Sequence, residues 1–206
     1  MLSGCQLLGV AAYKLTPPPT VQPKYTALAE QSIGVMVWTD QGLRIEWPGL
    51  RLDLANAVQT KFKAELAKKK PPKALIGVSF PVLPASIVRY QMDHPDELEA
   101  MPITDVAPKL GVQRLIYLEV EDFVTRGDQS VDLFRGMAKV TVRVLEITGG
   151  KSTIAFEKSG VAAAFPPKAP AEGIPNAGDY RIYVGTLDAL ASEIVHLFVP
   201  YQQEEW

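Results

Sequence analysis

The chain has 206 residues, enough for one domain with short appendages, and its hydrophobic fraction of 47% suffices for a buried core. A formal net charge of -2 argues against a general nucleic-acid-binding protein, which would carry a basic stripe. No apolar run of about 18 residues is present, so the sequence predicts no membrane-spanning helix. The single cysteine, Cys5, excludes an intrachain disulfide and a cysteine-cluster zinc site.

The first five residues include the tetrapeptide Leu2-Ser3-Gly4-Cys5, which resembles the lipobox of bacterial lipoproteins. In that family a signal peptidase cuts before the cysteine, whose thiol then carries diacylglycerol and whose new amine is acylated. The resemblance implies that acylated Cys5 anchors the protein to a membrane. This chain departs from the pattern because only Met1 precedes the box, so a true signal peptide would lie upstream. The alternative is a chance match with an idle thiol.

A proline-rich segment follows, with four prolines between residues 13 and 24 and no apolar periodicity. Such a segment favours an extended polyproline conformation and acts as a semi-rigid spacer. The alternative is an ordinary disordered terminus. We therefore divide the chain into a lipobox and tether (residues 1–24) and a single α/β domain (residues 25–206).

The first part of the domain predicts a strand, a helix and a second strand. Residues 33–38 form a continuous apolar run, typical of a strand covered on both faces. Residues 40–48 resemble an exposed loop, and residues 50–69 carry an apolar stripe every four residues, which predicts an amphipathic helix. Residues 73–80 are a second strand candidate, and the order suggests a crossover onto one sheet.

The central stretch predicts a short helix that leads into a long strand. Residues 86–92 favour one or two helical turns, and an acidic surface segment follows. We expect Thr104 to cap the next helix and Gly111 to end it. A strand then follows over residues 115–124, with alternating faces. One predicted face holds Ile116, Leu118, Val120 and Val124, and the other holds Tyr117, Glu119, Glu121 and Phe123.

The last third predicts two more long strands and a closing helix. Residues 134–147 alternate, with Ala138, Val140, Val142 and Val144 on one face. Residues 152–165 return as another strand with a bulge at Gly160. A long proline- and glycine-rich loop over residues 165–179 precedes a helix that we expect Thr186 to cap. The predicted fold is α/β (α+β): a mixed sheet of about five strands with helices packed mainly on one face.

At this point the chain resembles the periplasmic α/β modules of the curli-secretion lipoprotein CsgG, of penicillin-binding-protein activator lipoproteins and of the TolB amino-terminal domain. Three segments carry the resemblance: residues 52–58 of the first helix, the entry Lys109-Leu110-Gly111-Val112, and the strand over residues 139–149. The likeness covers residues 33–198. No membrane-inserting hairpin of the pore-forming kind is apparent, so the resemblance implies a lipid-tethered assembly partner rather than a channel.

The sharpest candidate for catalysis is the carboxylate pair Glu119 and Glu121, about 7 Å apart at backbone level on one strand face. The next strand offers Lys139 and Arg143 on the face of matching polarity. Antiparallel pairing would place opposite charges across from each other, and we favour this ladder over catalysis. The sequence contains no glycine-flanked serine elbow, dinucleotide fingerprint or P-loop, so we predict no enzyme and no cofactor.

A metal site around His94 would recruit Asp93, Asp96 and Glu97, but loop carboxylates are usually solvated, so we predict none. The candidate partner-binding residues are the aromatic side chains Trp38, Trp47, Tyr180 and Tyr183, because aromatic anchors supply much of the energy at interfaces. The alternative for each is ordinary packing. Residues 180–184 alternate and are also a candidate for pairing with a partner strand.

Two functions stay open from the sequence. The first is a lipid-anchored outer-membrane protein that faces the periplasm and binds another envelope protein or itself without catalysis. The second is a small-ligand-binding auxiliary lipoprotein of a transport system, with a pocket beneath the proline-rich loop. An apolar pocket of several hundred Å³ favours the second, and an exposed aromatic patch or strand edge favours the first.

Overall fold

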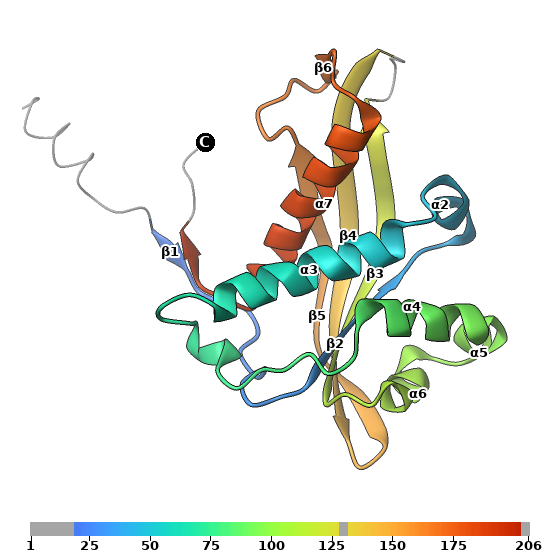
Figure 1. Cartoon of the computed structure of the whole chain (residues 1–206), viewed down its shortest axis with the longest axis vertical. Coiled ribbons are helices and arrows are strands. Elements are labelled where there is room, and N and C mark those ends of the chain that lie inside the picture. Colours follow the sequence, from blue (N-terminus) through green and yellow to red (C-terminus); the bar gives the residue numbers. More distant parts are fainter. Residues whose placement is uncertain (1–18, 128–131, 203–206) are drawn as a thin grey trace, which may run out of the picture.

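The body of the protein is a mixed β-sheet with helices on both faces. The structure is a computed structural model that describes residues 19–127 and 132–202. Its five-stranded sheet has the order β2-β3-β4-β5, and β6 pairs with β4 beyond this path (Figure 1). This confirms the predicted fold class. The strands are β2 (Ile33–Trp38), β3 (Arg114–Arg126), β4 (Leu133–Thr148), β5 (Lys151–Phe165) and β6 (Ile174–Pro175).

Strand β2 is parallel to β3, whereas β3, β4 and β5 are successively antiparallel. The register aligns Ile33 with Arg114 at one end and Trp38 with Glu119 at the other. The five residues from Ile33 to Val37 are all buried, as the continuous apolar run predicts for a strand covered on both faces. The carboxyl end of β2 therefore lies next to the middle of the much longer β3.

The two longest helices, α3 (Leu50–Leu66) and α7 (Asp179–Val195), pack together on one face of the sheet (Figure 1). The apolar stripe that predicts α3 is largely buried there, and so are Leu187, Leu190, Ala191 and Ile194 of α7. Phe62 of α3 contacts the ring of Phe198, which follows α7, at a centroid distance of 5.4 Å. The strands supply the predicted face of β4 to this core, since Ala138, Val140, Val142 and Val144 are all buried.

Helix α7 approaches the sheet closely because glycines lie on both sides of the contact, Gly136 in β4 and Gly185 in α7. A Cβ atom on Gly136 of β4 would lie 1.7 Å from Thr186 Oγ1, so no side chain fits at this crossing. Gly185 of α7 lies against the ring of Phe165, with 2.4 Å between its hypothetical Cβ and the nearest ring carbons. The Asp179 carboxylate fixes the start of the helix by accepting bonds from Thr125 and Arg126.

The opposite face of the sheet is covered over part of its length by shorter elements and a second apolar core. Met36, Leu115, Tyr117 and Leu145 point from the strands into this core, where Ile87 meets them. The helices on this side are α4 (Pro84–Asp93), α5 (Pro95–Ala100), α6 (Ile103–Val106) and the 3₁₀ turn η2 (Ala107–Leu110). Gly111 ends this series with φ 69°, which confirms its predicted left-handed role.

A β-bulge corrects the predicted faces of β3. The pairing with β4 shifts between Val120 and Asp122, so Glu121 is an extra residue. One extra residue reverses the alternation beyond it. Phe123, predicted to lie on the mixed face opposite the core, is therefore buried in the main core, and Val124 is only partly buried. The predicted bulge at Gly160 in β5 is confirmed, with φ 68° and a register shift between Val140 and Val142 of β4.

The predicted strand over residues 73–80 is wrong. The segment forms the 3₁₀ turn η1 (Lys73–Leu75) and then contributes a single parallel bridge between Ser79 and Ser32. Gly77 adopts φ 73° with the Glu30 side chain against it, which interrupts an extended conformation. The parallel partner of β2 is instead β3.

Three further expectations, one about a loop and two about helix caps, are also wrong. The predicted loop after β2 contains helix α2 (Gln41–Glu46), capped by Asp40, whose Oδ1 accepts the amide hydrogen of Leu43 at 2.8 Å. Pro102, not Thr104, precedes α6. Thr186 does not cap α7, because the helix already begins at Asp179. It lies fully buried inside the helix, where its hydroxyl donates to the Ile182 carbonyl oxygen.

The two ends of the described chain meet in a small antiparallel ribbon. Strand β1 (Thr20–Val21) pairs with β7 (Tyr201–Gln202), so two residues assigned by sequence to the tether pair with the end of the body. Figure 1 shows this ribbon on the opposite side of the molecule from α2. Cys5 lies outside the described residues. Among those residues, no helix is both long and apolar enough to cross a membrane.

Candidate functional site

A pocket of about 530 Å³ lies where the second core meets the open part of the sheet. We call it the α5–α6 pocket, since residues 98–106 of these helices form one wall. Its apolar lining includes Met36, Trp38, Leu98, Ile103, Val106 and Tyr117. Met36, Val106 and Tyr117 are themselves buried, so the pocket has a well-packed base. Burial, followed by the charge of Glu119, raises the pKa of Tyr117 and keeps its phenol neutral.

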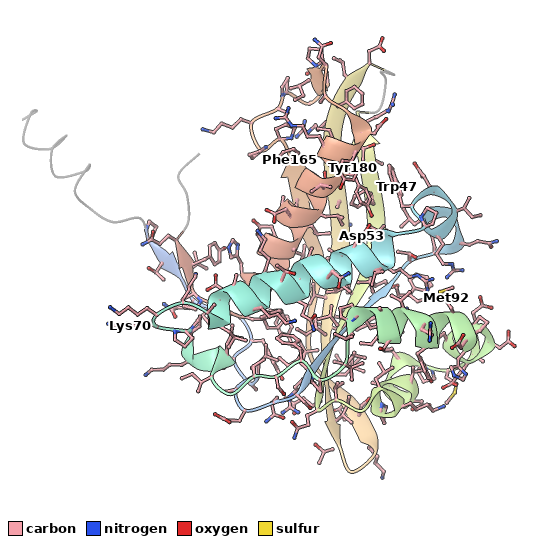
Figure 2. The ribbon with its side chains drawn as sticks, in the orientation of Figure 1. Trp47, Asp53, Lys70, Met92, Phe165 and Tyr180 are labelled. Carbon is pink, nitrogen blue, oxygen red and sulfur yellow. The ribbon has the colours of Figure 1, made fainter. Side chains whose placement is uncertain are left out.

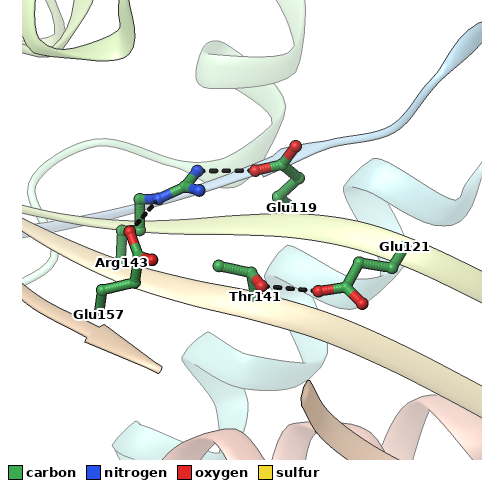
Figure 3. A network of polar contacts seen from close by, with 5 residues as sticks. All are labelled: Glu119, Glu121, Thr141, Arg143 and Glu157. Carbon is green, nitrogen blue, oxygen red and sulfur yellow. Dashed lines mark hydrogen bonds and ion pairs between the residues drawn. The ribbon is translucent and has the colours of Figure 1, made fainter. Parts of the chain in front are cut away.

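Along its sheet side the pocket is bordered by an ion-pair network. Arg143 donates to Glu119 at 2.6 Å and to Glu157 at 2.7 Å, which joins β3, β4 and β5 (Figure 3). Glu119 and Arg143 both line the pocket. Because one guanidinium lies between two carboxylates, these charges are largely satisfied by one another.

The predicted cross-strand ladder is confirmed next to this network. Lys139 Nζ lies 2.7 Å from the Glu121 carboxylate. The same carboxylate accepts a bond from the Thr141 hydroxyl at 2.6 Å (Figure 3). The hydrogen bond from Lys139, and then that from Thr141, lower the pKa of Glu121. The carboxylates predicted by sequence as the catalytic alternative are thus both ion-paired.

Arg44 of α2 lines the same pocket but is not part of this ion-pair network. Its Nη1 donates to the Thr39 carbonyl oxygen at 3.1 Å. Within the described parts of the chain, no carboxylate lies within 4.0 Å of its guanidinium. Burial and then the nearby Arg44 charge lower the pKa of Arg51, so the two cations lie close enough to repel.

A cluster of aromatic rings lies on the α3–α7 face of the sheet. The Trp47 ring stacks on Tyr183 with 5.4 Å between centroids, and both contact the buried Phe123 ring edge-on. The Tyr183 hydroxyl donates to Asp53 Oδ2 at 2.8 Å. Burial and this hydrogen bond raise the pKa of Tyr183. Two of the predicted partner-binding residues, Trp47 and Tyr183, therefore come together and are partly buried.

Tyr180 lies one helical turn before Tyr183 and is 80% exposed, with Val184 also exposed on the same helix (Figure 2). The expectation that residues 180–184 form a strand is wrong, because the segment is the first part of α7. We call Trp47, Tyr180, Tyr183 and Val184 the α7 aromatic surface. Trp38 is not part of this surface, because it lines the α5–α6 pocket with the second core.

The two histidines lie apart. His94, in the short α4–α5 connection, packs against Tyr90 with 4.6 Å between ring centroids and the rings tilted by 39°. Nearby Glu97 accepts hydrogen bonds from Tyr90 and Lys109. His196 follows α7 and stacks on Tyr201 of β7 at 3.9 Å. Among the described residues, no group of three or more His, Cys, Asp or Glu side chains is placed to hold a metal ion.

Sequence reasoning did not single out Arg44, Met36 or Tyr117 as site residues. The pocket takes its lining from α2, α5, α6, β2, β3 and β4, which are far apart in sequence. Arg44 was assigned to an exposed loop. The sequence feature that could have placed Arg44 in a helix is Asp40, an acidic N-cap residue at the start of α2. The pocket also lies away from the proline-rich loop beneath which a ligand site was expected.

No protein-family model matches the sequence, and no curated protein is similar to it. Among solved structures, the PelC dodecamer from Paraburkholderia phytofirmans is 12% identical, with a TM-score of 0.40 over 85% of this chain and 94% of that chain. The lipoprotein GNA1162 from Neisseria meningitidis is 15% identical, with a TM-score of 0.39 over 80% of this chain and 94% of that chain. The hypothetical protein CT253 from Chlamydia trachomatis is 13% identical, with a TM-score of 0.37 over 66% of this chain and 73% of that chain. These scores are too low to support an inference, and the resemblance to the CsgG group stays a prediction.

Proposed function

We propose that this protein is a lipid-anchored cell-envelope protein whose folded body binds another envelope component without catalysing a reaction. The anchor is Cys5 of the lipobox-like tetrapeptide, and the proposed location is the periplasmic side of the outer membrane. The observation that carries the binding role is the α7 aromatic surface. Tyr180 is almost fully exposed beside a fixed stack of Trp47 on Tyr183. Tyrosine and tryptophan in such settings are the residues that most often dominate binding energy.

The proposed geometry separates anchor and binding surface. The tether leads into β1, which pairs with β7 at one side of the body. Helix α2, whose C-cap residue is Trp47, lies at the opposite side (Figure 1). An anchor on the β1 side leaves the α7 aromatic surface accessible to a partner in the periplasm.

The absence of catalysis is part of the same proposal. Its support is the state of the acidic side chains: Glu119 is bound by Arg143, and Glu121 is bound by Lys139 with a lowered pKa. A general acid needs a carboxyl group whose pKa is raised toward the working pH. Glu121 is stabilised in the opposite, ionised form, and Glu119 is held in an ion pair with Arg143.

In-cell photo-crosslinking tests the binding role. A benzophenone side chain replaces Tyr180 in the full chain in its native cell, and the matched control places it at the exposed Arg89 of α4. We expect a discrete adduct from position 180 that is absent from position 89, and mass analysis distinguishes a second copy from another protein. Equal adducts from both positions, or none from position 180, would contradict the proposal.

A second candidate function is the carriage of a small ligand. It is favoured by the α5–α6 pocket, whose volume of about 530 Å³ falls within the range of ligand sites. Its base is apolar, and four charged side chains, Arg44, Glu99, Glu119 and Arg143, also line it. This candidate does not depend on the anchor or on the α7 aromatic surface.

A further inference from the structure

The α5–α6 pocket lies at a position in the sheet where ligands commonly bind. It adjoins the carboxyl end of β2, where Trp38 pairs with Glu119 of the parallel strand β3. In open α/β sheets, ligands bind outside the carboxyl ends of parallel strands. The chain that leaves β2 forms α2 and brings Arg44 to the rim of this pocket.

The polar side chains around the pocket differ in whether they already have partners. Arg143 and Glu119 satisfy each other at 2.6 Å, and Glu157 adds a second carboxylate at 2.7 Å. Arg44 is half-buried and makes one bond, from Nη1 to the Thr39 carbonyl oxygen. Its remaining N–H donors have no carboxylate partner within the described residues. A guanidinium has five donors, so Arg44 is the side chain with capacity to bind an incoming group.

The charge around Arg44 favours an anion. Arg51, at the start of α3, is close enough to Arg44 for their charges to repel, and no carboxylate in the described chain neutralises either one. Glu99 also lines the pocket, but it is exposed, and solvent and salt screen its charge. A bound carboxylate or sulfonate would relieve the repulsion between the two arginines.

We propose that the α5–α6 pocket binds a small amphiphilic anion, with the anionic group on Arg44 and the apolar part against Trp38, Leu98 and Ile103. The inference rests on the second candidate function, ligand carriage. The ligand is a monomeric small molecule with an acidic head and an aliphatic or aromatic body. The pocket volume limits it to about the size of a drug-like molecule.

Calorimetric titration with two amphiphiles of opposite charge, whose alkyl tails differ by one methylene, tests the charge preference. The probes are decanoate and decyltrimethylammonium, and the protein is the full chain with Cys5→Ser, which removes acylation. We expect decanoate to bind at least about tenfold more tightly, as one charge-assisted hydrogen bond allows. Equal affinities, or tighter binding of the cation, would overturn the assignment of an anion.

Substitutions locate the site. Arg44→Gln should weaken decanoate binding about tenfold, whereas Arg44→Lys should keep most of it. Arg89→Gln removes an exposed arginine of α4 that does not line the pocket, and decanoate binding should be unchanged. Glu99→Gln should strengthen binding modestly. The inference is wrong if Arg89→Gln weakens binding as much as Arg44→Gln, or if Arg44→Gln has no effect in a protein whose unfolding midpoint is unaltered.

Tryptophan fluorescence gives an independent readout. Trp38 lines the pocket, whereas Trp47 lies in the α7 aromatic surface. We expect decanoate to change the emission of the parent chain and Trp38→Phe to remove that change. Persistence of the change in Trp38→Phe would place the ligand elsewhere and overturn the inference.

Two further outcomes separate this inference from the other proposals. If neither amphiphile binds, both the inference and the ligand-carrier function are wrong, while the anchor and the crosslinking result are unaffected. If the chain sediments with phosphatidylglycerol vesicles in an Arg44-dependent manner but ignores monomeric decanoate, the anion is a membrane headgroup and the soluble-ligand inference is overturned.

Discussion

The substitution Gly136→Ala tests the close packing of α7 on the sheet, which fixes the position of the α7 aromatic surface. The added Cβ would lie 1.7 Å from Thr186 Oγ1 and 3.0 Å from Ile182 Cγ2. Non-bonded heavy atoms prefer a separation of about 3.5–4.0 Å. The hydroxyl must therefore rotate away, and the helix must move outward.

Two costs add in this variant. Overpacking costs about 1–3 kcal/mol. Rotation of the buried Thr186 hydroxyl away from the Ile182 carbonyl oxygen loses a hydrogen bond of 2.7 Å, which costs about 0.5–1.5 kcal/mol. Replacing a strand glycine regains about 0.5–1 kcal/mol. The expected loss in unfolding free energy is about 0.5–4 kcal/mol, or a fall in Tm of about 1–16 °C.

The assay is urea unfolding followed by circular dichroism, arranged as a double-mutant cycle. Thr186→Ala removes the atom that clashes most, so the double variant should recover at least about 1 kcal/mol relative to the sum of the single variants. Gly42→Ala in α2 is the control, because its added methyl has its nearest contact at 3.4 Å and should be neutral or stabilising. Simple additivity, or no loss in Gly136→Ala, would refute the reasoning about the helix–sheet spacing.

Three other predictions follow from individual contacts. Tyr183→Phe keeps the ring stack but removes the bond to Asp53, so urea unfolding should show a loss of about 0.5–1.5 kcal/mol with little change in tryptophan emission. Burial lowers the pKa of His196 below 6.5, so the unfolded chain binds a proton more readily than the folded chain. The unfolding free energy should therefore fall as the pH drops below about 7. His196→Gln should reduce this pH dependence. An NMR titration should accordingly show His196 losing its proton at a lower pH than an unperturbed imidazole, and an ordinary or raised pKa would contradict this. Phe62→Ala leaves a cavity beneath α3 and should cost about 3–5 kcal/mol in the same urea assay, and a loss under 1 kcal/mol would show that Phe62 is not part of the core.

The sequence predicted those parts of the fold in which one period runs unbroken. The alternation from Ala138 to Val144 and the apolar stripe of α3 gave the correct buried faces, because local periodicity and burial coincide there. The prediction failed at Phe123, because the extra residue Glu121 reverses the two faces of β3 and nothing in the amino-acid composition indicates such a bulge. The start of α7 was also missed, because residues 180–184 alternate and Thr186 is a favourable cap residue, whereas the helix begins at Asp179.

The same division applies to the candidate site. The Glu121–Lys139 and Glu119–Arg143 pairs were predictable, because a hairpin between adjacent strands fixes which charges face each other. Trp38 and Arg44 meet only through the tertiary arrangement of β2 and α2 around a wall made by residues 98–106. No local pattern contains that information, so the α5–α6 pocket was beyond sequence reasoning.

Mass spectrometry of the mature protein isolated from its native membranes tests the central claim, that this body is tethered to a bilayer. We predict an amino terminus at Cys5 that carries a thioether-linked diacylglycerol and an acylated amine. Recovery of an unlipidated chain from the cytosol, with the residues before Cys5 still attached, would contradict the account.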